Sequence, residues 1–185
     1  MIKIEGLNVY FGDQIIIKNF NADIPVGITA VNGPSGIGKT TLLNVLAGLK
    51  EYKGEITGIN GKSVSFAFQE FRLFDTLTAF ENVKIAVKGQ GDIKKIIKDM
   101  EMDEFQNKYP GELSGGMQQR VSLARALAKN ADIILLDEPF TALDEGLKKR
   151  IAQRMKPYLE DKTTVMVTHN SDDFSLLPPN KIIEL

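Results

Sequence analysis

The sequence predicts an α/β fold with a mostly parallel sheet, an antiparallel β element at the N-terminal end and a small helical part. A glycine-rich loop at residues 33–41 joins an apolar strand pattern at 27–32 to leucines at helical spacing in 39–49. The run 133–136 is apolar throughout, which is typical of a strand buried on both faces of a parallel sheet. Residues 2–24 alternate between apolar and polar side chains around a Gly-Asp turn, which indicates antiparallel strands.

The composition is that of an ordinary soluble protein and excludes several kinds of site. With 185 residues, 43% of them hydrophobic, the chain suits one domain. It has no cysteine for disulfides or thiolate catalysis, and its single histidine provides no zinc cluster. Lys and Arg number 23 against 24 Asp and Glu, so no nucleic-acid partner is expected. Without a signal peptide or an apolar run of about 20 residues, we expect a cytoplasmic chain.

The loop at 33–41 fits the pattern G-x-x-x-x-G-K-[ST] at every position. Its glycines let backbone N–H groups approach phosphate oxygens, and the following helix presents its positive end. Lys39 is expected to reach the β- and γ-phosphates of a nucleotide, and the Thr40 hydroxyl to ligate Mg²⁺. The alternative, a glycine-rich turn that binds nothing, is disfavoured by the complete pattern between a strand and a helix. The predicted phosphate-binding residues are Gly33, Ser35, Gly36, Gly38, Lys39, Thr40 and Thr41.

The segments on either side of this loop supply further candidates. Tyr10 and Phe11 precede the Gly-Asp turn, where either ring could stack on a base or simply pack within the strand. Residues 55–69 form another β pattern, and Gln69 falls where that strand ends. An amide at this place can orient water or touch a metal ion, although an ordinary loop glutamine would look the same.

From about residue 77 to 102 the pattern becomes helical, with an amphipathic run that begins at Asp92. Another helix begins at Ser114, a natural N-cap, and carries Gly115 and Gly116 in its first turn. Because two glycines cost helix stability without a local benefit, they favour an anion site over an ordinary capped helix. One nucleotide needs this second site only if two molecules share it.

The apolar run 133–136 leads directly into Asp137 and Glu138. Functional side chains gather at the carboxyl ends of parallel strands. Asp137 is therefore expected to hold Mg²⁺ through water, and Glu138 to polarise a water for attack on the γ-phosphate. A pair of solvated loop acids is the alternative, which the phosphate loop disfavours.

The C-terminal part continues the strand and helix pattern. A helix is expected after Asp144, with the two lysines and the arginine at 148–150 facing solvent. A β run at 163–168 ends beside His169, and residues 181–185 form a last short strand. A lone histidine is usually structural, but this one follows a strand on the predicted active edge, so we interpret it as a γ-phosphate sensor.

These motifs, in this order, resemble those of the nucleotide-binding subunits of ATP-binding cassette (ABC) transporters over essentially the whole chain. The glycine loop is similar to the Walker A motif, and Asp137 and Glu138 to the Walker B aspartate and the catalytic glutamate. Residues 113–118 resemble the LSGGQ signature, with Met117 where the family usually has glutamine and Gln118 supplying an adjacent amide. The other matches are Gln69 with the Q-loop glutamine, residues 141–144 with the D-loop and His169 with the switch histidine.

The resemblance implies a P-loop NTPase core in a single ABC ATPase domain, residues 1–185, with a helical subdomain inserted at about 71–128. It also implies a head-to-tail dimer in which the glycine loop of one subunit and the Ser114 helix start of the other hold each ATP. In the family, the aromatic residue before the turn stacks on adenine, which favours Phe11 over Tyr10. The implied catalytic residues are Glu138, His169, Gln69 and Lys39. The implied Mg²⁺ site consists of Thr40, Gln69 and Asp137. The partner subunit contributes Ser114, Gly115, Gly116 and Asp144.

Several partners follow from the same resemblance. They are an integral membrane permease, which docks near Gln69 and the helical segment, a second copy of the ATPase and an extracytoplasmic solute-binding protein. The chain would then lie at the inner face of the membrane. Residues 69–83 are similar to those of importer subunits, including the nitrate, sulfonate and taurine group, and no regulatory C-terminal domain is expected.

Two other functions predict features that the sequence does not show. A non-transport ABC ATPase of DNA repair or translation would have a long coiled-coil insertion, a duplicated cassette or a basic face. A small-molecule kinase with a phosphate loop would need an acceptor site and an arginine-rich lid in place of the Ser114 motif.

Overall fold

The computed structural model describes residues 1–87 and 92–185; residues 88–91, within the predicted helical subdomain, lie outside the described residues. A five-stranded sheet has the strand order β5-β6-β7-β3-β8, and every pairing in it is parallel. Its strands are β5 (Val64–Ala67), β6 (Ile133–Asp137), β7 (Thr163–Val167), β3 (Gly27–Asn32) and β8 (Lys181–Glu184). A separate three-stranded antiparallel sheet joins β2 (Gln14–Ile24), β1 (Ile2–Phe11) and β4 (Lys53–Thr57). The predicted α/β class is confirmed.

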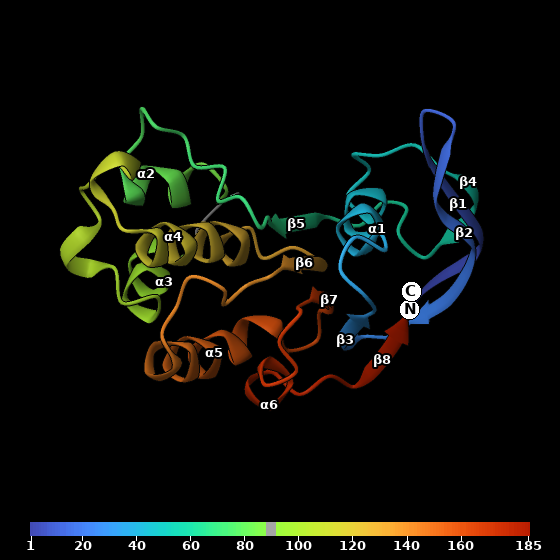
Figure 1. The fold of residues 1–185 in the computed structure, drawn as a ribbon. Helices are drawn as coiled ribbons and strands as arrows, with labels where there is room; N and C mark the ends of the chain where they lie inside the picture. Colours follow the sequence, from blue (N-terminus) through green and yellow to red (C-terminus); the bar gives the residue numbers. More distant parts are fainter. Residues whose placement is uncertain (88–91) are drawn as a thin grey trace.

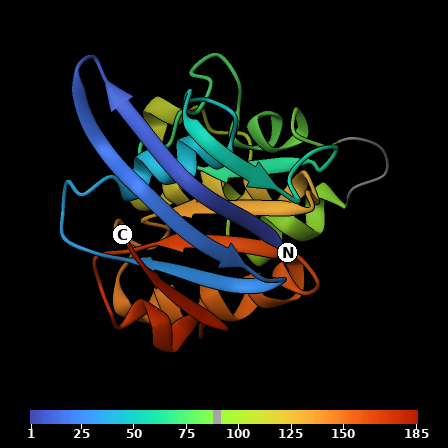
Figure 2. The same ribbon diagram turned by 90° about the vertical axis from the view of Figure 1, so that its right-hand side faces the viewer.

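The parallel sheet separates two hydrophobic cores, which explains why β6 is apolar without interruption. Ile133 and Leu135 pack in the core shared with the antiparallel sheet and α1 (Lys39–Leu46). Ile134 and Leu136, which point to the opposite face, pack in the core shared with the remaining helices. Figure 1 shows α1 between the two sheets, and Figure 2 shows the long strands of the antiparallel sheet in front of it.

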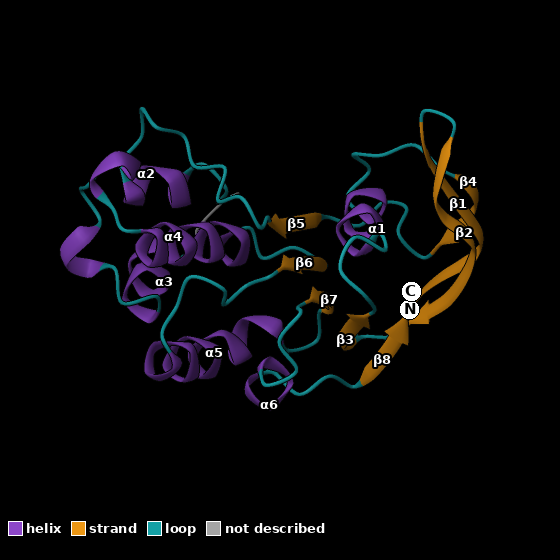
Figure 3. Ribbon diagram, viewed as in Figure 1, coloured by secondary structure: helices purple, strands orange, loops and turns teal. Residues whose placement is uncertain are grey.

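The other helices follow in chain order as α2 (Ala79–Lys84), α3 (Ile93–Asp99), α4 (Gly115–Ala128), α5 (Glu145–Leu159) and α6 (Asp173–Leu176), with 3-10 turns η1 (Asp103–Phe105) and η2 (Pro110–Glu112). α2, α3 and α4 lie together on the side of the molecule away from the antiparallel sheet (Figures 1 and 3). Each begins at a side-chain cap: Thr78 in a capping box with Glu81, Asp92, and Ser114.

Most predicted elements are present, with shifts at their ends. α1 ends at Leu46, within the predicted range 39–49, and Gly48 takes the left-handed conformation (φ 71°) that stops a helix. The prediction that residues 148–150 of α5 face solvent is wrong for Lys148. This side chain is 8% exposed, and its Nζ atom lies 3.0 Å from the Oε1 atom of Glu145. In the described part of the chain, no helix is both long and apolar enough to cross a membrane.

Candidate functional site

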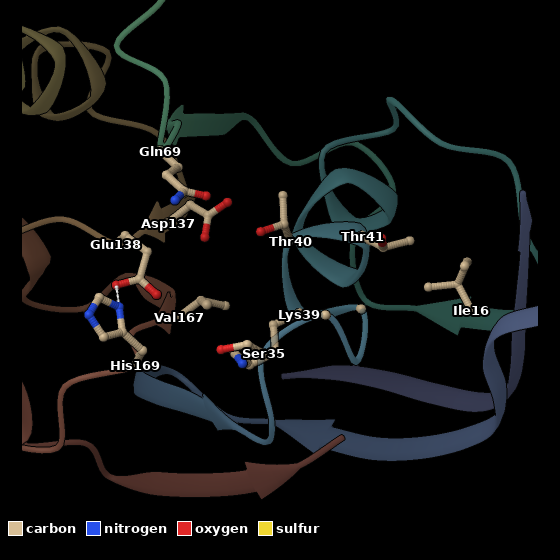
Figure 4. Close-up of a pocket in the computed structure, with 12 residues that line it drawn as sticks. Ile16, Ser35, Lys39, Thr40, Thr41, Gln69, Asp137, Glu138, Val167 and His169 are labelled. Atoms are coloured by element: carbon tan, nitrogen blue, oxygen red, sulfur yellow. Dashed lines mark hydrogen bonds and ion pairs between the residues drawn. The ribbon is translucent and has the colours of Figure 1, made fainter. Parts of the chain in front are cut away.

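A pocket of about 420 Å³ opens where β6 and β7 end and α1 begins (Figure 4). Five segments that are distant in the sequence meet there. Four of them follow parallel strands, which direct their carboxyl ends to one edge of the sheet, and the fifth is Ile16 of β2. The pocket is lined by Ile16, Ser35, Gly36, Gly38, Lys39, Thr40, Thr41, Gln69, Asp137, Glu138, Val167 and His169. The structure thus brings most of the predicted site residues together in one chain.

Two glycines shape the loop that enters this pocket. Gly38 caps α1 with a φ of 115°, and a Cβ there would lie 3.0 Å from the Cγ2 atom of Ile16. Gly33 has a φ of 147°, and a Cβ there would lie 3.0 Å from the carbonyl oxygen of Leu185. Only glycine fits both the dihedral angles and the close approach, so the loop lies tightly between β2 and the end of the chain.

Lys39 is directed back onto the loop. Its Nζ donates to the carbonyl oxygens of Gly33 at 2.7 Å and Pro34 at 2.9 Å. No side chain caps the start of α1, so the first-turn N–H groups remain available to an anion, and the ammonium lies beside them. The loop therefore combines a helix N-terminus with a fixed cation, as a phosphate site requires.

Asp137 and Thr40 face each other across the pocket (Figure 4). Asp137 is 1% exposed, and its Oδ1 atom has no hydrogen-bond partner among the described residues. Burial raises the pKa of this carboxyl, while the Thr40 hydroxyl acts to lower it. A buried carboxylate oxygen without a donor, beside a hydroxyl, suits Mg²⁺, which needs one or two protein oxygens when phosphates complete its shell. The residues present therefore fit the metal predicted from the sequence.

Glu138 is held in a strained position. It is a non-glycine residue with a φ of 51°, and its N–H donates to the carbonyl oxygen of Val167 at 2.9 Å. Its Oε2 atom lies 2.7 Å from the Nδ1 atom of His169, and the Thr141 hydroxyl lies 3.4 Å from the same oxygen. The strain and these contacts direct the carboxylate into the pocket, where a water molecule and a phosphate could meet it.

The sequence reasoning missed residues that support these groups. The Thr168 hydroxyl donates to Asp173 at 2.6 Å, and both side chains are buried. This hydrogen bond holds the segment that carries His169 against the start of α6. Ile16 and Val167 form apolar walls of the pocket. The alternating pattern of β2 indicates that Ile16 packs inward, but nothing in the sequence distinguishes Asp173 from the other acidic residues near it.

Phe11 lies beside a second, adjoining pocket of about 260 Å³ and is 74% exposed. That pocket shares Ile16 and Thr41 with the phosphate pocket. The Nζ atom of Lys50 lies 5.2 Å from the Phe11 ring centroid, whereas the Tyr10 ring faces Lys53 outside this pocket. The structure therefore places Phe11, and not Tyr10, next to the phosphate pocket.

The start of α4 does not reach the pocket. In Figure 1 it lies on the side of the molecule distant from α1, and none of Ser114, Gly115 and Gly116 lines the pocket. Ser114 accepts a hydrogen bond from the N–H of Met117 at 3.3 Å and so caps its own helix. Asp144, also outside the pocket, caps α5 by accepting from the N–H of Leu147 at 2.9 Å.

Two expectations about the signature segment are wrong. A Cβ on Gly116 would lie 2.7 Å from the carbonyl oxygen of Ala142, so this glycine does have a local packing reason. At Gly115 no described atom lies within 4 Å of such a Cβ. The Gln118 amide does not replace the one missing at Met117, because it donates inward to the carbonyl oxygens of residues 110 and 113, at 3.0 and 3.1 Å.

Comparison with known proteins agrees with this geometry. A sequence model described as ABC transporter matches residues 17–141, well over half of the chain. The sulfate/thiosulfate import ATP-binding protein CysA of Bacillus cereus is 37% identical over 93% of this chain and 55% of its own length. The aliphatic sulfonates import ATP-binding protein SsuB of the same species is 38% identical over 98% of this chain and 80% of its own. The chain thus spans about half the length of its CysA relatives.

Solved structures show the same likeness in three dimensions. A dimeric structure of the ATP-binding cassette MJ0796 in a post-hydrolysis state, bound to ADP and Pi, superposes with a TM-score of 0.83. It is 34% identical to this chain, and the match covers all of this chain and 94% of that one. A second dimeric structure of the MJ0796 cassette matches with the same TM-score and 35% identity. The chain therefore belongs to the ABC transporter family.

Proposed function

We propose that the chain binds and hydrolyses ATP as the ATPase subunit of an ABC transporter, and that ATP-driven closure of a dimer powers transport by a separate membrane permease. The observation that carries this proposal is the contact of 2.7 Å between Glu138 and His169, opposite the Lys39 loop in one pocket. A carboxylate, an imidazole and a phosphate loop so arranged are the parts that in-line hydrolysis of a γ-phosphate needs.

The proposed reaction is attack of water on the γ-phosphate. Glu138 accepts the proton of the attacking water, and its contact with His169 fixes the carboxylate in the direction of attack. Lys39 exchanges the carbonyl oxygens of its own loop for phosphate oxygens and offsets their charge. Gln69, at the end of β5, lines the same pocket and is assigned to orienting water and contacting the metal. The adenine base stacks on Phe11 in the adjoining pocket.

Magnesium has a defined place in this proposal. Thr40 and Asp137 would hold it, with Gln69 beside them. When bound, the ion neutralises charge on the β- and γ-phosphate oxygens. It would also satisfy the orphaned Oδ1 atom of Asp137.

The proposal of a dimer rests on predicted ATP-binding residues that do not line the pocket. Ser114, Gly115, Gly116 and Asp144 lie outside it, so in a single chain they cannot contact the same nucleotide. We propose that a second copy of the chain supplies them head to tail, which encloses ATP between the phosphate loop of one copy and the α4 start of the other. The dimeric form of both MJ0796 structures supports this arrangement.

The permease is proposed to dock on a groove of about 460 Å³ beside the helical subdomain, which we place at about residues 71–128. Phe74 and Ile85 in this groove are 54% and 52% exposed, so the groove presents two large apolar side chains side by side with its basic residues. The groove is lined by Phe66, Phe68, Arg72, Phe74, Ile85, Ala86, Arg125 and Lys129. Its lining residues Phe68 and Arg72 flank Gln69 in the sequence, so movement of a docked permease would reach the ATP pocket through this segment.

The direction of transport is proposed from the relatives, whose names describe import of sulfate, thiosulfate and aliphatic sulfonates. An importer of this kind would be completed by an extracytoplasmic solute-binding protein, and the chain would lie at the inner face of the membrane. The alternative of a non-transport ATPase in DNA repair or translation is not favoured, because the similar proteins are import subunits.

Replacing Glu138 by glutamine tests the proposed reaction. The amide keeps the shape of the side chain but cannot accept the proton, so steady-state hydrolysis should fall about 1,000-fold. ATP affinity should be unchanged, and the variant should accumulate as an ATP-bound dimer with twice the mass of the 20.5 kDa chain. Glu160→Gln, at an exposed carboxylate, is the matched control. Hydrolysis by Glu138→Gln at the parental rate would show that this residue is not the general base.

A further inference from the structure

Glu101 has an unusual backbone for its residue type. It follows α3 with a φ of 53°, and its N–H donates to the carbonyl oxygen of Lys98 at 2.9 Å. The N–H of Met102 donates to the carbonyl oxygen of Ile97 at 3.0 Å. Together these two bonds end α3 at a residue in the left-handed conformation. Glycine is the usual residue at such a position because a Cβ is strained there. A glutamate in its place indicates that the side chain offsets the strain.

The Glu101 carboxylate joins α3 to α5. Its two oxygens accept from Arg150, with Nε to Oε1 at 2.8 Å and Nη2 to Oε2 at 3.2 Å. Arg154, one turn later in α5, places its Nη2 atom 3.2 Å from Oε1. These arginines, Arg150 first, hold the pKa of Glu101 below its usual range, so the carboxylate is charged at neutral pH.

The backbone of the same residue joins α3 to α4. Arg120 in α4 is 7% exposed, and its Nη1 atom donates to the carbonyl oxygens of Met100 at 3.0 Å and Glu101 at 2.7 Å. Its Nε atom donates to the carbonyl oxygen of Gly116 at 3.4 Å, in the first turn of α4. Gly116 in turn lies against the Ala142 carbonyl, in the segment that leads into α5. Glu101 thus closes a ring of contacts through α5, α3 and the start of α4.

We propose that Glu101 is a positioning residue that fixes the start of α4 relative to α5, and that it thereby sets how well this chain completes the ATP site of a second copy. This proposal rests on the proposed function. Glu101 lines none of the ATP pocket, so its loss should leave nucleotide binding to the pocket intact. It should weaken only the step in which two chains close on ATP.

Glu101→Gly separates positioning from a merely structural role. Glycine relieves the left-handed strain, so the melting temperature should stay at the parental value or rise. The kcat for ATP hydrolysis should nevertheless fall about five-fold, with unchanged affinity for a fluorescent ATP analogue. In the Glu138→Gln background, the ATP concentration for half-maximal dimerisation should rise by a similar factor. A residue that only ended α3 would give a glycine variant with parental kinetics.

Arg150→Ala provides the second arm, because it removes the main partner without altering the α3 backbone. It should reproduce the loss of kcat, and the double variant with Glu101→Gly should be no worse than either single change. Lys149→Ala, at the exposed neighbouring position, should hydrolyse ATP like the parent. Parental kcat and dimerisation in both Glu101→Gly and Arg150→Ala would overturn the positioning role. The proposed function would fail separately, if the parent itself did not hydrolyse ATP.

Discussion

The phosphate loop and the start of α4 are both glycine-containing helix N-termini, yet they have different surroundings. The phosphate loop meets Asp137, Glu138 and His169 of its own chain in one pocket. The α4 start meets none of them, and Gly115 has no described atom near its Cβ direction. Only the phosphate loop is surrounded by groups of its own chain that could act on a bound anion.

This difference is the reason why the proposed function includes a second copy of the chain. Groups that catalyse a reaction are gathered by the parallel sheet, which brings strand ends together whatever their separation in the sequence. The α4 start belongs to the helices on the other side of the molecule (Figure 1) and is connected to α5 through contacts such as those of Glu101. In the proposed dimer, a site divided in this way would be complete only when a second copy approaches.

Among changes at the α4 start, the largest expected effect comes from Ser114→Arg. A long cation at the α4 start should prevent the second copy from closing on ATP, so hydrolysis should fall about 100-fold. ATP affinity, measured with a fluorescent analogue, should stay at the parental value because Ser114 lies outside the pocket. Parental hydrolysis by this variant would mean that α4 takes no part in the site.

A smaller effect separates the two glycines of α4. Gly116→Ala would force its Cβ against the Ala142 carbonyl oxygen and should lower the free energy of unfolding by about 2 kcal/mol. Gly115→Ala has open space and should raise it by about 0.5–1 kcal/mol through helix propensity, as urea denaturation can measure. Reduced hydrolysis by the stabilised Gly115→Ala variant would show that Gly115 serves a second chain. Equal stability changes in the two variants would contradict the packing described for Gly116.

Much of this comparison could be predicted from the sequence. Periodicity identified the strands and helices, and the motifs identified Lys39, Asp137, Glu138 and His169 before their proximity was visible. The sequence could not show that Gly116 packs against Ala142 or that Gln118 donates inward, because such contacts depend on tertiary approach. The role of Glu101 was hidden for the same reason, since its left-handed backbone and its arginine partners are visible only in the fold.

The smallest effect concerns Asp137, whose buried Oδ1 atom has no hydrogen-bond partner among the described residues. Burial raises the pKa of Asp137 from its ordinary 3.8, so the folded state binds a proton more readily than the unfolded state. At neutral pH the desolvated carboxylate therefore destabilises the protein, and Asp137→Asn should be about 1 kcal/mol more stable without nucleotide. The advantage should shrink as the pH falls through the raised pKa and should be lost below the ordinary value of 3.8, where Asp137 is protonated in both the folded and the unfolded state. Denaturant melts at both pH values measure this, and an equal advantage at low pH would assign it to packing.

The central claim, that each ATP site is shared by two chains, is tested most directly by mixing two impaired variants. Lys39→Ala removes the phosphate-loop cation, and Ser114→Arg blocks the α4 start, so each variant alone should hydrolyse ATP about 100-fold or more slower than the parent. A mixed dimer has one site with both defects and one site with neither. The mixture should therefore recover about a quarter of the parental rate, because half of the dimers are mixed and half of their sites are intact. No recovery, at concentrations where the parent is fully active, would contradict a site shared between two copies.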